Sequence, residues 1–375
     1  MLRKFIALGI ALSVATLSLA PALVHAQSIV IGQSTPLSGG NKELGEDIRD
    51  GALAYFKKVN EAGGINGRKI ELITLDDAND VKKSEANTRA LIDQHNAVAL
   101  FGYASATLSM PALPLVERAK MTFFAPFTGA EPMRQFNRYV FNHRASYSDE
   151  LAAIVEHYTS IGVKRFAVLH YDDAVGKENF AAVSNALKSH QLEPVAVAAV
   201  KRPQTDFTKE VAAVSRANPE LVITTTAYKT TSDFIKLTRQ GDSVAQFVSI
   251  SFAGSTALAV ALGEQGIGVA MSQVVPPVNR SSIGIVKEYQ QAMGKLTGKQ
   301  TYSYTSLESF IAAKVLVEGI KRAGAAVTRD SVLKSLDNLG NFDVGGYAVN
   351  FTPSNHNGSR YVGMTILSRD LAFRD

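Results

Sequence analysis

Cysteine is absent from this chain of 375 residues. The absence excludes disulfide bonds, thiolate metal sites, a cysteine nucleophile and lipid attachment through an N-terminal cysteine. Blocks of basic residues are absent as well, because lysine and arginine are spread along the chain and the formal net charge is only +5. We therefore expect no binding to nucleic acid.

Long apolar runs are also missing, with one exception at the N-terminus. Arg3 and Lys4 precede that run, and small residues lead from it to Ala26. This order is typical of a secretory signal peptide, so we expect residues 1–26 to be removed by cleavage after Ala26. Pro21 and several hydroxyl residues interrupt the run, which disfavours an uncleaved membrane anchor. No other run has the ~20 apolar residues needed to cross a bilayer, and we expect an exported protein in the periplasm.

Sequence motifs of catalysis are lacking. The chain has no G-x-S-x-G, H-E-x-x-H, Walker loop or strand-linked G-x-G-x-x-G. Its histidines are scattered singly, so no metal site is expected. The pairs Asp76-Asp77 and Asp172-Asp173 follow apolar runs, where an aspartate usually caps a turn or a helix. We expect a protein without catalytic residues, metal or cofactor, and keep an exported hydrolase as an alternative that turnover of model esters or peptides would support.

What the chain does contain is an alternation of short apolar runs and amphipathic patterns between residues 29 and 251. Runs such as "SIVIGQ", "VALFGY" and "RFAVLHYDD" are continuously apolar, which is typical of strands buried on both faces. The stretches between them have helical periodicity, and several end in glycine. The alternation predicts an α/β fold with parallel sheets covered by helices. The length favours two domains.

Two neighbouring strand ends carry small and hydroxyl residues. The first is "FGYASATLSMPALP" and the second is "APFTGAEPMR". Ligands of open parallel sheets bind beyond the carboxyl ends of the strands, where Ser105, Thr107 and Thr128 can donate hydrogen bonds and Phe127 can form an apolar wall. Thr107 or Ser109 as a simple helix N-cap is the alternative. The repetition at both strand ends favours a binding site.

The second half of the chain has comparable strand ends. "TTTAYK" and "SISFAGST" close their strands with Tyr228, Ser251 and Phe252. Surface packing of Tyr228 and core burial of Phe252 are equally compatible with these patterns. We therefore keep all three as candidates for contact with a ligand.

Three segments predict boundaries between domains. In "VFNHRASYSDE" an extended stretch leads to an expected N-cap at Ser148. In "SQVVPPVNRSS" the pair Pro276-Pro277 cannot continue a central strand, which favours a crossover. "NFTPSNHNGSRYVGM" is a turn-rich loop before the final strand.

As a whole, the chain resembles the type I periplasmic binding proteins of ABC importers, in the leucine/isoleucine/valine-binding group. The resemblance runs from Ile29 to about Leu367, and its most diagnostic segment is "STPLSGGNKELGEDIRDGALAYFKKVNEAGGINGRKIELITLDDAND". It implies two doubly wound parallel-sheet lobes, joined by a three-segment hinge, that close around a solute and hand it to a membrane permease. By this resemblance the N-terminal lobe holds residues 27–142 and 278–347, and the C-terminal lobe holds residues 143–277 and 348–375.

The resemblance also implies which residues bind the ligand. Together with the strand-end candidates Ser251 and Phe252, the implied set is Leu44, Tyr103, Ser105, Ala106, Thr107, Phe127, Thr128 and Tyr228.

One departure from the family concerns the ligand's amino group. Binders of branched-chain amino acids place an acid after a second-lobe strand, because a desolvated ammonium needs a partner. Here Ser251 or Phe252 occupies that position. Asp172, Asp173 or Glu308 could substitute for the missing acid.

These observations predict a monomeric solute-binding protein that delivers a small carboxylate-bearing molecule to the permease of an ABC transporter. A branched-chain type of amino acid is the first candidate, and an aromatic or other organic acid is the second. A sensory ligand-binding module is a further alternative.

Overall fold

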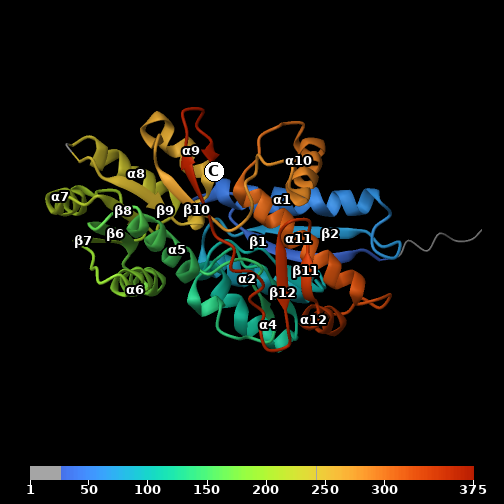
Figure 1. The fold of residues 1–375 in the computed structure, drawn as a ribbon. Helices are drawn as coiled ribbons and strands as arrows, with labels where there is room; N and C mark the ends of the chain where they lie inside the picture. The colour runs from blue at the N-terminus through green and yellow to red at the C-terminus, as the bar shows by residue number, and fades with distance from the viewer. Residues whose placement is uncertain (1–26, 242) are drawn as a thin grey trace, which may run out of the picture.

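The computed structural model describes residues 27–241 and 243–375. Two α/β lobes lie side by side, with the green and yellow lobe at the left of Figure 1 and the blue and orange lobe at the right. The predicted α/β fold of two parallel-sheet lobes is thereby confirmed. The predicted signal peptide, residues 1–26, lies outside the described residues.

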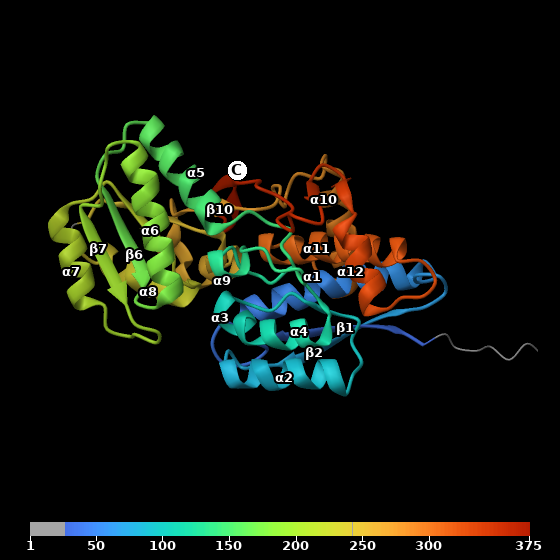
Figure 2. The ribbon, with the colours of Figure 1, turned by 90° about the horizontal axis from the view of Figure 1, so that it is seen from below.

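The first lobe is built on a five-stranded parallel sheet with the order β2-β1-β3-β4-β5. Helix α2 covers one face of this sheet, and α1 and α11 lie on the other (Figure 2). The strands are β1 (Ile29–Thr35), β2 (Ile70–Asp76), β3 (Ala99–Phe101), β4 (Thr122–Phe124) and β5 (Val140–Phe141). The helices in this part of the chain are α1 (Lys42–Glu61), α2 (Val81–Asp93), α3 (Ala106–Ser109) and α4 (Leu113–Ala119).

The second lobe is built on a seven-stranded sheet with the order β14-β13-β10-β9-β8-β6-β7. Strand β13 runs antiparallel to its neighbours β10 and β14, and all other pairs in this sheet are parallel. The strands are β6 (Phe166–Tyr171), β7 (Ala196–Val200), β8 (Leu221–Thr224), β9 (Gln246–Ser249), β10 (Ala270–Gln273), β13 (Gly363–Leu367) and β14 (Phe373–Arg374). The helices are α5 (Tyr147–Ser160), α6 (Ala174–Ser189), α7 (Thr208–Ala217), α8 (Tyr228–Arg239) and α9 (Ser255–Leu262).

After β10 the chain returns to the first lobe. There it forms α10 (Gly284–Thr297), α11 (Tyr304–Arg322) and α12 (Arg329–Asp337). Helix α11 packs closely on α1, and a Cβ atom added to Gly51 of α1 would lie 2.1 Å from the carbonyl oxygen of Ser306. A glycine is therefore needed where these two helices meet.

A hairpin of β11 (Gly340–Asp343) and β12 (Ala348–Phe351) also lies with the first lobe. The ring of Phe351 packs edge-on against Phe124 and Phe141, with centroids 6.0 and 5.3 Å away. The sequence boundary after residue 347 assigned β12 to the second lobe instead. The apolar side chain of Phe351 keeps the strand on the first lobe, and the chain joins the second sheet at β13.

Two helix caps differ from the sequence expectations. Ser146, and not Ser148, caps α5 in a capping box, because its hydroxyl accepts from the Asp149 amide at 2.9 Å. Ser105, and not Thr107 or Ser109, caps the short helix α3. The hydroxyl of Thr107 is therefore not used as the cap of that helix.

Candidate functional site

A narrow pocket, with a free volume of about 20 Å3, lies where the strand ends of the two lobes face each other. A larger groove exists among α1, α9 and the C-terminal strand, but parallel sheets bind ligands at the carboxyl ends of their strands. The residues that line the strand-end pocket are Ser105, Ala106, Thr107, Thr128, Tyr147, Tyr171, Val175, Gly176, Asn179, Arg202, Thr225 and Phe252.

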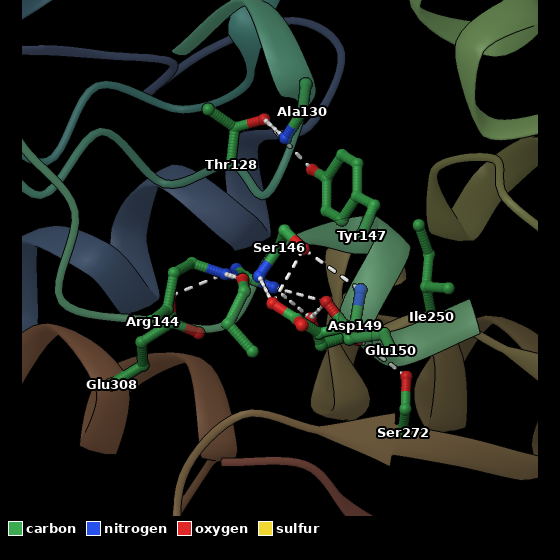
Figure 3. Close-up of polar contacts among 12 residues, drawn as sticks. Thr128, Ala130, Arg144, Ser146, Tyr147, Asp149, Glu150, Ile250, Ser272 and Glu308 are labelled. Atoms are coloured by element: carbon green, nitrogen blue, oxygen red, sulfur yellow. Dashed lines mark hydrogen bonds and ion pairs between the residues drawn. The ribbon is translucent and has the colours of Figure 1, made fainter. Parts of the chain in front are cut away.

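Hydroxyl groups form the first-lobe side of the pocket. The loops after β3 and β4 are held together because the Ser105 amide donates to the Phe127 carbonyl at 3.2 Å. The Thr128 hydroxyl accepts from the Ala130 amide at 3.1 Å and donates to the Tyr147 hydroxyl at 3.2 Å (Figure 3). Since the Tyr147 oxygen already accepts a hydrogen bond, its own proton is available to a ligand.

An arginine stacked on a tyrosine forms part of the second-lobe side. The Arg202 guanidinium lies 3.6 Å from the ring centroid of Tyr171, which ends β6. Arg202 also pairs with Asp173 at 3.2 Å, and Asp173 caps α6 by accepting from the Gly176 amide at 2.8 Å. The Tyr171 hydroxyl accepts from the Ala227 amide at 3.2 Å. These contacts hold the cation and the ring together as one wall.

Five of the ten predicted ligand-binding residues line this pocket. They are Ser105, Ala106, Thr107, Thr128 and Phe252. The other five lie elsewhere, and they are Leu44, Tyr103, Phe127, Tyr228 and Ser251.

Two of these five are buried inside the first lobe. Tyr103 is fully buried, its hydroxyl lies 3.0 Å from the Thr88 hydroxyl, and its ring packs on Phe123. Phe127 is also buried, with the Arg144 guanidinium 5.4 Å from its ring centroid.

Leu44 and Tyr228 lie at contacts between the lobes. Leu44 on α1 approaches Gly254 of the second lobe, where an added Cβ would be 3.3 Å from the Leu44 Cδ1 atom. The Tyr228 hydroxyl on α8 donates to the Glu43 carboxylate on α1 at 2.5 Å. This hydrogen bond lowers the pKa of Glu43. Both contacts join the two lobes directly.

Ser251 belongs to a buried charge cluster beside the hinge. Its amide donates to the Glu150 carboxylate at 2.8 Å, and its hydroxyl contacts Arg144. The Arg144 guanidinium, fully buried, donates to Glu150 at 2.7 Å and to Glu308 at 3.0 Å (Figure 3). Glu308 comes from the first lobe and Glu150 from the second, so Arg144 connects the lobes at the crossing segment after β5. Burial raises the pKa of Glu308 to about 7, although Arg144 opposes the shift.

The acids that could have replaced the missing ammonium partner do not line the pocket. Asp172 pairs with Lys177 at 2.9 Å near the surface. Asp173 pairs with Arg202, and Glu308 pairs with Arg144.

Several lining residues were missed by the sequence reasoning, among them Tyr147, Tyr171 and Arg202. Tyr171 immediately precedes Asp172-Asp173 at a strand end, so its position was a usable signal. Arg202 lies in the loop after β7, and no local pattern separates it from other surface cations. Its place in the pocket depends on its stacking against Tyr171.

Residues 27–241 and 243–375 contain neither a candidate membrane span nor a cluster of metal-ligating side chains. No helix in these ranges is long and apolar enough to cross a membrane. No group of three or more histidine and acidic side chains in them could hold a metal ion.

Comparisons with known proteins agree with this architecture. The family model described as "Periplasmic binding protein" matches residues 28–368. An "Amino acid binding protein" of Pseudomonas aeruginosa is 25% identical over 319 residues, which are 84% of this chain and 85% of that protein.

Two solved structures are similar over nearly the whole chain. A possible leucine/isoleucine/valine-binding protein from Rhodopirellula baltica has a TM-score of 0.89 and 29% identity, covering 94% of this chain and 96% of its own. A substrate-binding periplasmic protein from Ralstonia solanacearum has a TM-score of 0.86 and 30% identity, covering 93% and 100%.

Proposed function

This chain belongs to the periplasmic binding protein family, and we propose that it captures a small carboxylate-bearing solute between its lobes and delivers it to the permease of an ABC importer. The single observation that carries the proposal is the pocket between the strand ends, which has hydroxyl groups on one lobe and aromatic rings on the other. A solute that contacts both walls favours the closed state over the open one. Capture and release need no covalent chemistry, so we expect no enzymatic activity.

The first lobe is the side that would bind the carboxylate. Ser105 and Thr107 supply hydroxyl protons there, and Tyr147, which accepts the proton of Thr128, adds its own. Hydrogen bonds to an ionised oxygen are about twice as strong as bonds between neutral groups. A carboxylate therefore gains more from this side of the pocket than an alcohol or amide would.

Two solute classes are supported by different observations. The names of the relatives favour an amino acid of the branched-chain type. The rings of Tyr147, Tyr171 and Phe252 favour an aromatic or other organic acid instead. In either case we expect a monomer that works in the periplasm.

Substitution of two hydroxyls tests the proposal. Ser105→Ala with Thr107→Ala should weaken binding about a hundredfold, because each lost bond to a charged group costs about 1.5 kcal/mol or more. A thermal-shift screen of amino acids and organic acids identifies a ligand, and mass spectrometry of co-purified small molecules provides a second route. Bound ligand should add about 2.7 kcal/mol of stability at a hundredfold excess over its Kd.

The matched control is Thr159→Ala with Ser160→Ala at the end of α5, outside the pocket. This pair removes the same two kinds of hydroxyl and should leave Kd unchanged. Equal affinity for the pocket variant and the wild type would remove Ser105 and Thr107 from the binding site.

A further inference from the structure

We propose that the pocket selects carboxylates that carry no ammonium group, and that Arg202 and Phe252 determine this selectivity. The inference rests on the proposed function, because it concerns the solute class of the same pocket.

The lining of the pocket has no carboxylate that could pair with an ammonium ion. Among the residues that the structure describes, no aspartate or glutamate lines it, and Phe252, one of the two residues at the strand end where an acid was expected, lines it instead. An amino acid enclosed here would bury its ammonium without a carboxylate partner. A buried charge without a partner is strongly unfavourable.

The acids nearest to the lining are already engaged. One Asp173 oxygen accepts from the Gly176 amide and the other pairs with Arg202. Glu150 accepts from Arg144, from Ser251 and from the Ser272 hydroxyl at 2.6 Å. Turning either carboxylate towards a ligand would break these bonds.

Two more acids lie near the outside of the cleft. Glu131 and Glu178 are exposed, and neither lines the pocket. Partial burial and the negative charge of Glu131 raise the pKa of Glu178. Glu131 accepts a hydrogen bond from Ser148 at 2.8 Å. In these positions they remain in water, where an ion pair contributes little to affinity.

The charge that does reach the pocket is positive. Arg202 is part of the lining. Behind the opposite wall, the Arg144 guanidinium lies 5.4 Å from the Phe127 ring centroid and 5.7 Å from that of Tyr147. Arg144 pairs with Glu150 and Glu308, and Arg202 pairs with Asp173 at 3.2 Å, but of these side chains only Arg202 lines the pocket. An ammonium group would meet a guanidinium and no carboxylate in the lining, whereas an apolar body can pack on the rings of Tyr171 and Phe252.

Two ligand pairs that differ only in the α-amino group test the inference. They are 3-phenylpropanoate with L-phenylalanine, and 4-methylpentanoate with L-leucine. Isothermal titration calorimetry on the mature protein should give a Kd at least tenfold lower for an acid than for its amino acid.

The outcomes separate this inference from the proposed function. Equal or tighter binding of the amino acids overturns the inference and leaves solute capture standing. If none of the four compounds binds or raises Tm, the result counts against the carboxylate pocket itself and against its selectivity.

Substitutions at Phe252 test whether this residue determines the selectivity for acids over amino acids. Phe252→Glu supplies a carboxylate to the pocket and should shift the acid-to-amino-acid affinity ratio at least tenfold towards the amino acid. Phe252→Gln has nearly the same shape without the charge, so it separates the charge from the loss of the ring. Identical ratios for the two variants, both shown to be folded by circular dichroism, would exclude Phe252 as the determinant.

Substitutions at Arg202 provide an independent check. Arg202→Gln removes the cation and leaves Asp173 unpaired at the pocket wall, so it should shift the same ratio at least threefold towards the amino acid. Arg202→Lys retains the charge and should keep the wild-type ratio. A ratio that stays unchanged in Arg202→Gln would show that this cation does not contribute to selectivity.

Discussion

At the scale of single residues, the direction of a side chain decides whether it lines the pocket, and neighbouring positions in the sequence can differ in this respect. Tyr103 and Ser105 are two residues apart, yet Tyr103 packs into the first-lobe core while Ser105 lines the pocket. Strand β3 ends at Phe101, and the φ values of Gly102 and Ser105 are 60° and 72°, so both residues follow the end of strand geometry. Strand alternation therefore does not extend to it, and sequence spacing could not separate the two roles.

The buried carboxyl group of Glu308 predicts how the stability of the protein changes with pH. Its folded-state pKa is raised to about 7 by burial, above the unfolded value of about 4.3. Between these values the folded protein binds more protons than the unfolded chain, so this carboxyl makes stability fall as pH rises. Urea unfolding of wild type and Glu308→Gln from pH 4.5 to 8 should show the variant gaining stability relative to the wild type as pH rises. A constant difference across that range would contradict the assignment.

At the scale of elements, most helices and strands follow from local patterns, but their partners do not. The alternation of apolar runs and helical periodicity predicted the parallel sheets. The predicted boundary after residue 347 separated β12 from β11, whereas the structure keeps both strands with the first lobe. Phe351 of β12 packs on Phe141, which lies about two hundred residues earlier in the chain. A contact between residues so far apart in the sequence leaves no local sequence pattern from which it could be predicted.

The packing of α1 on α11 gives the test at this scale. Gly51→Ala should lower the free energy of unfolding by about 3 kcal/mol, because the new methyl group would overlap the backbone of Ser306. Gly294→Ala in α10 is the matched control, since an added Cβ there meets no atom within 4 Å. It should raise stability by about 1 kcal/mol through helix propensity. Equal effects of the two substitutions, measured by urea unfolding, would refute the close contact.

At the scale of the whole molecule, two polar contacts join the lobes outside the pocket. The hydrogen bond from Tyr228 to Glu43 joins α8 of one lobe to α1 of the other. Neither residue lines the pocket, so under the proposed function we expect this bond to favour the closed state without a contact to the solute. Arg144 makes a second connection, between Glu150 and Glu308.

Removal of the first connection should loosen closure. Tyr228→Phe is expected to weaken solute binding about fivefold, the equivalent of the ~1 kcal/mol that one hydrogen bond contributes. Small-angle scattering of the ligand-free variant should give a larger radius of gyration than the wild type. Glu43→Gln is the partner variant, and the double variant should be no weaker than either single one if the two side chains act through one bond. Additive losses would show that they act separately.

The sequence by itself determined the class of fold and several residues on one side of the candidate pocket. Apolar runs, helical periodicity and hydroxyl-rich strand ends are local properties, and Ser105, Thr107 and Thr128 could be named from them. Only the tertiary structure decided that Tyr147, Tyr171 and Arg202 complete the pocket and that Tyr103 turns away from it. The physical reason is that a pocket between lobes is formed by contacts between segments far apart in the chain, and those contacts exist only after both sheets have folded and met.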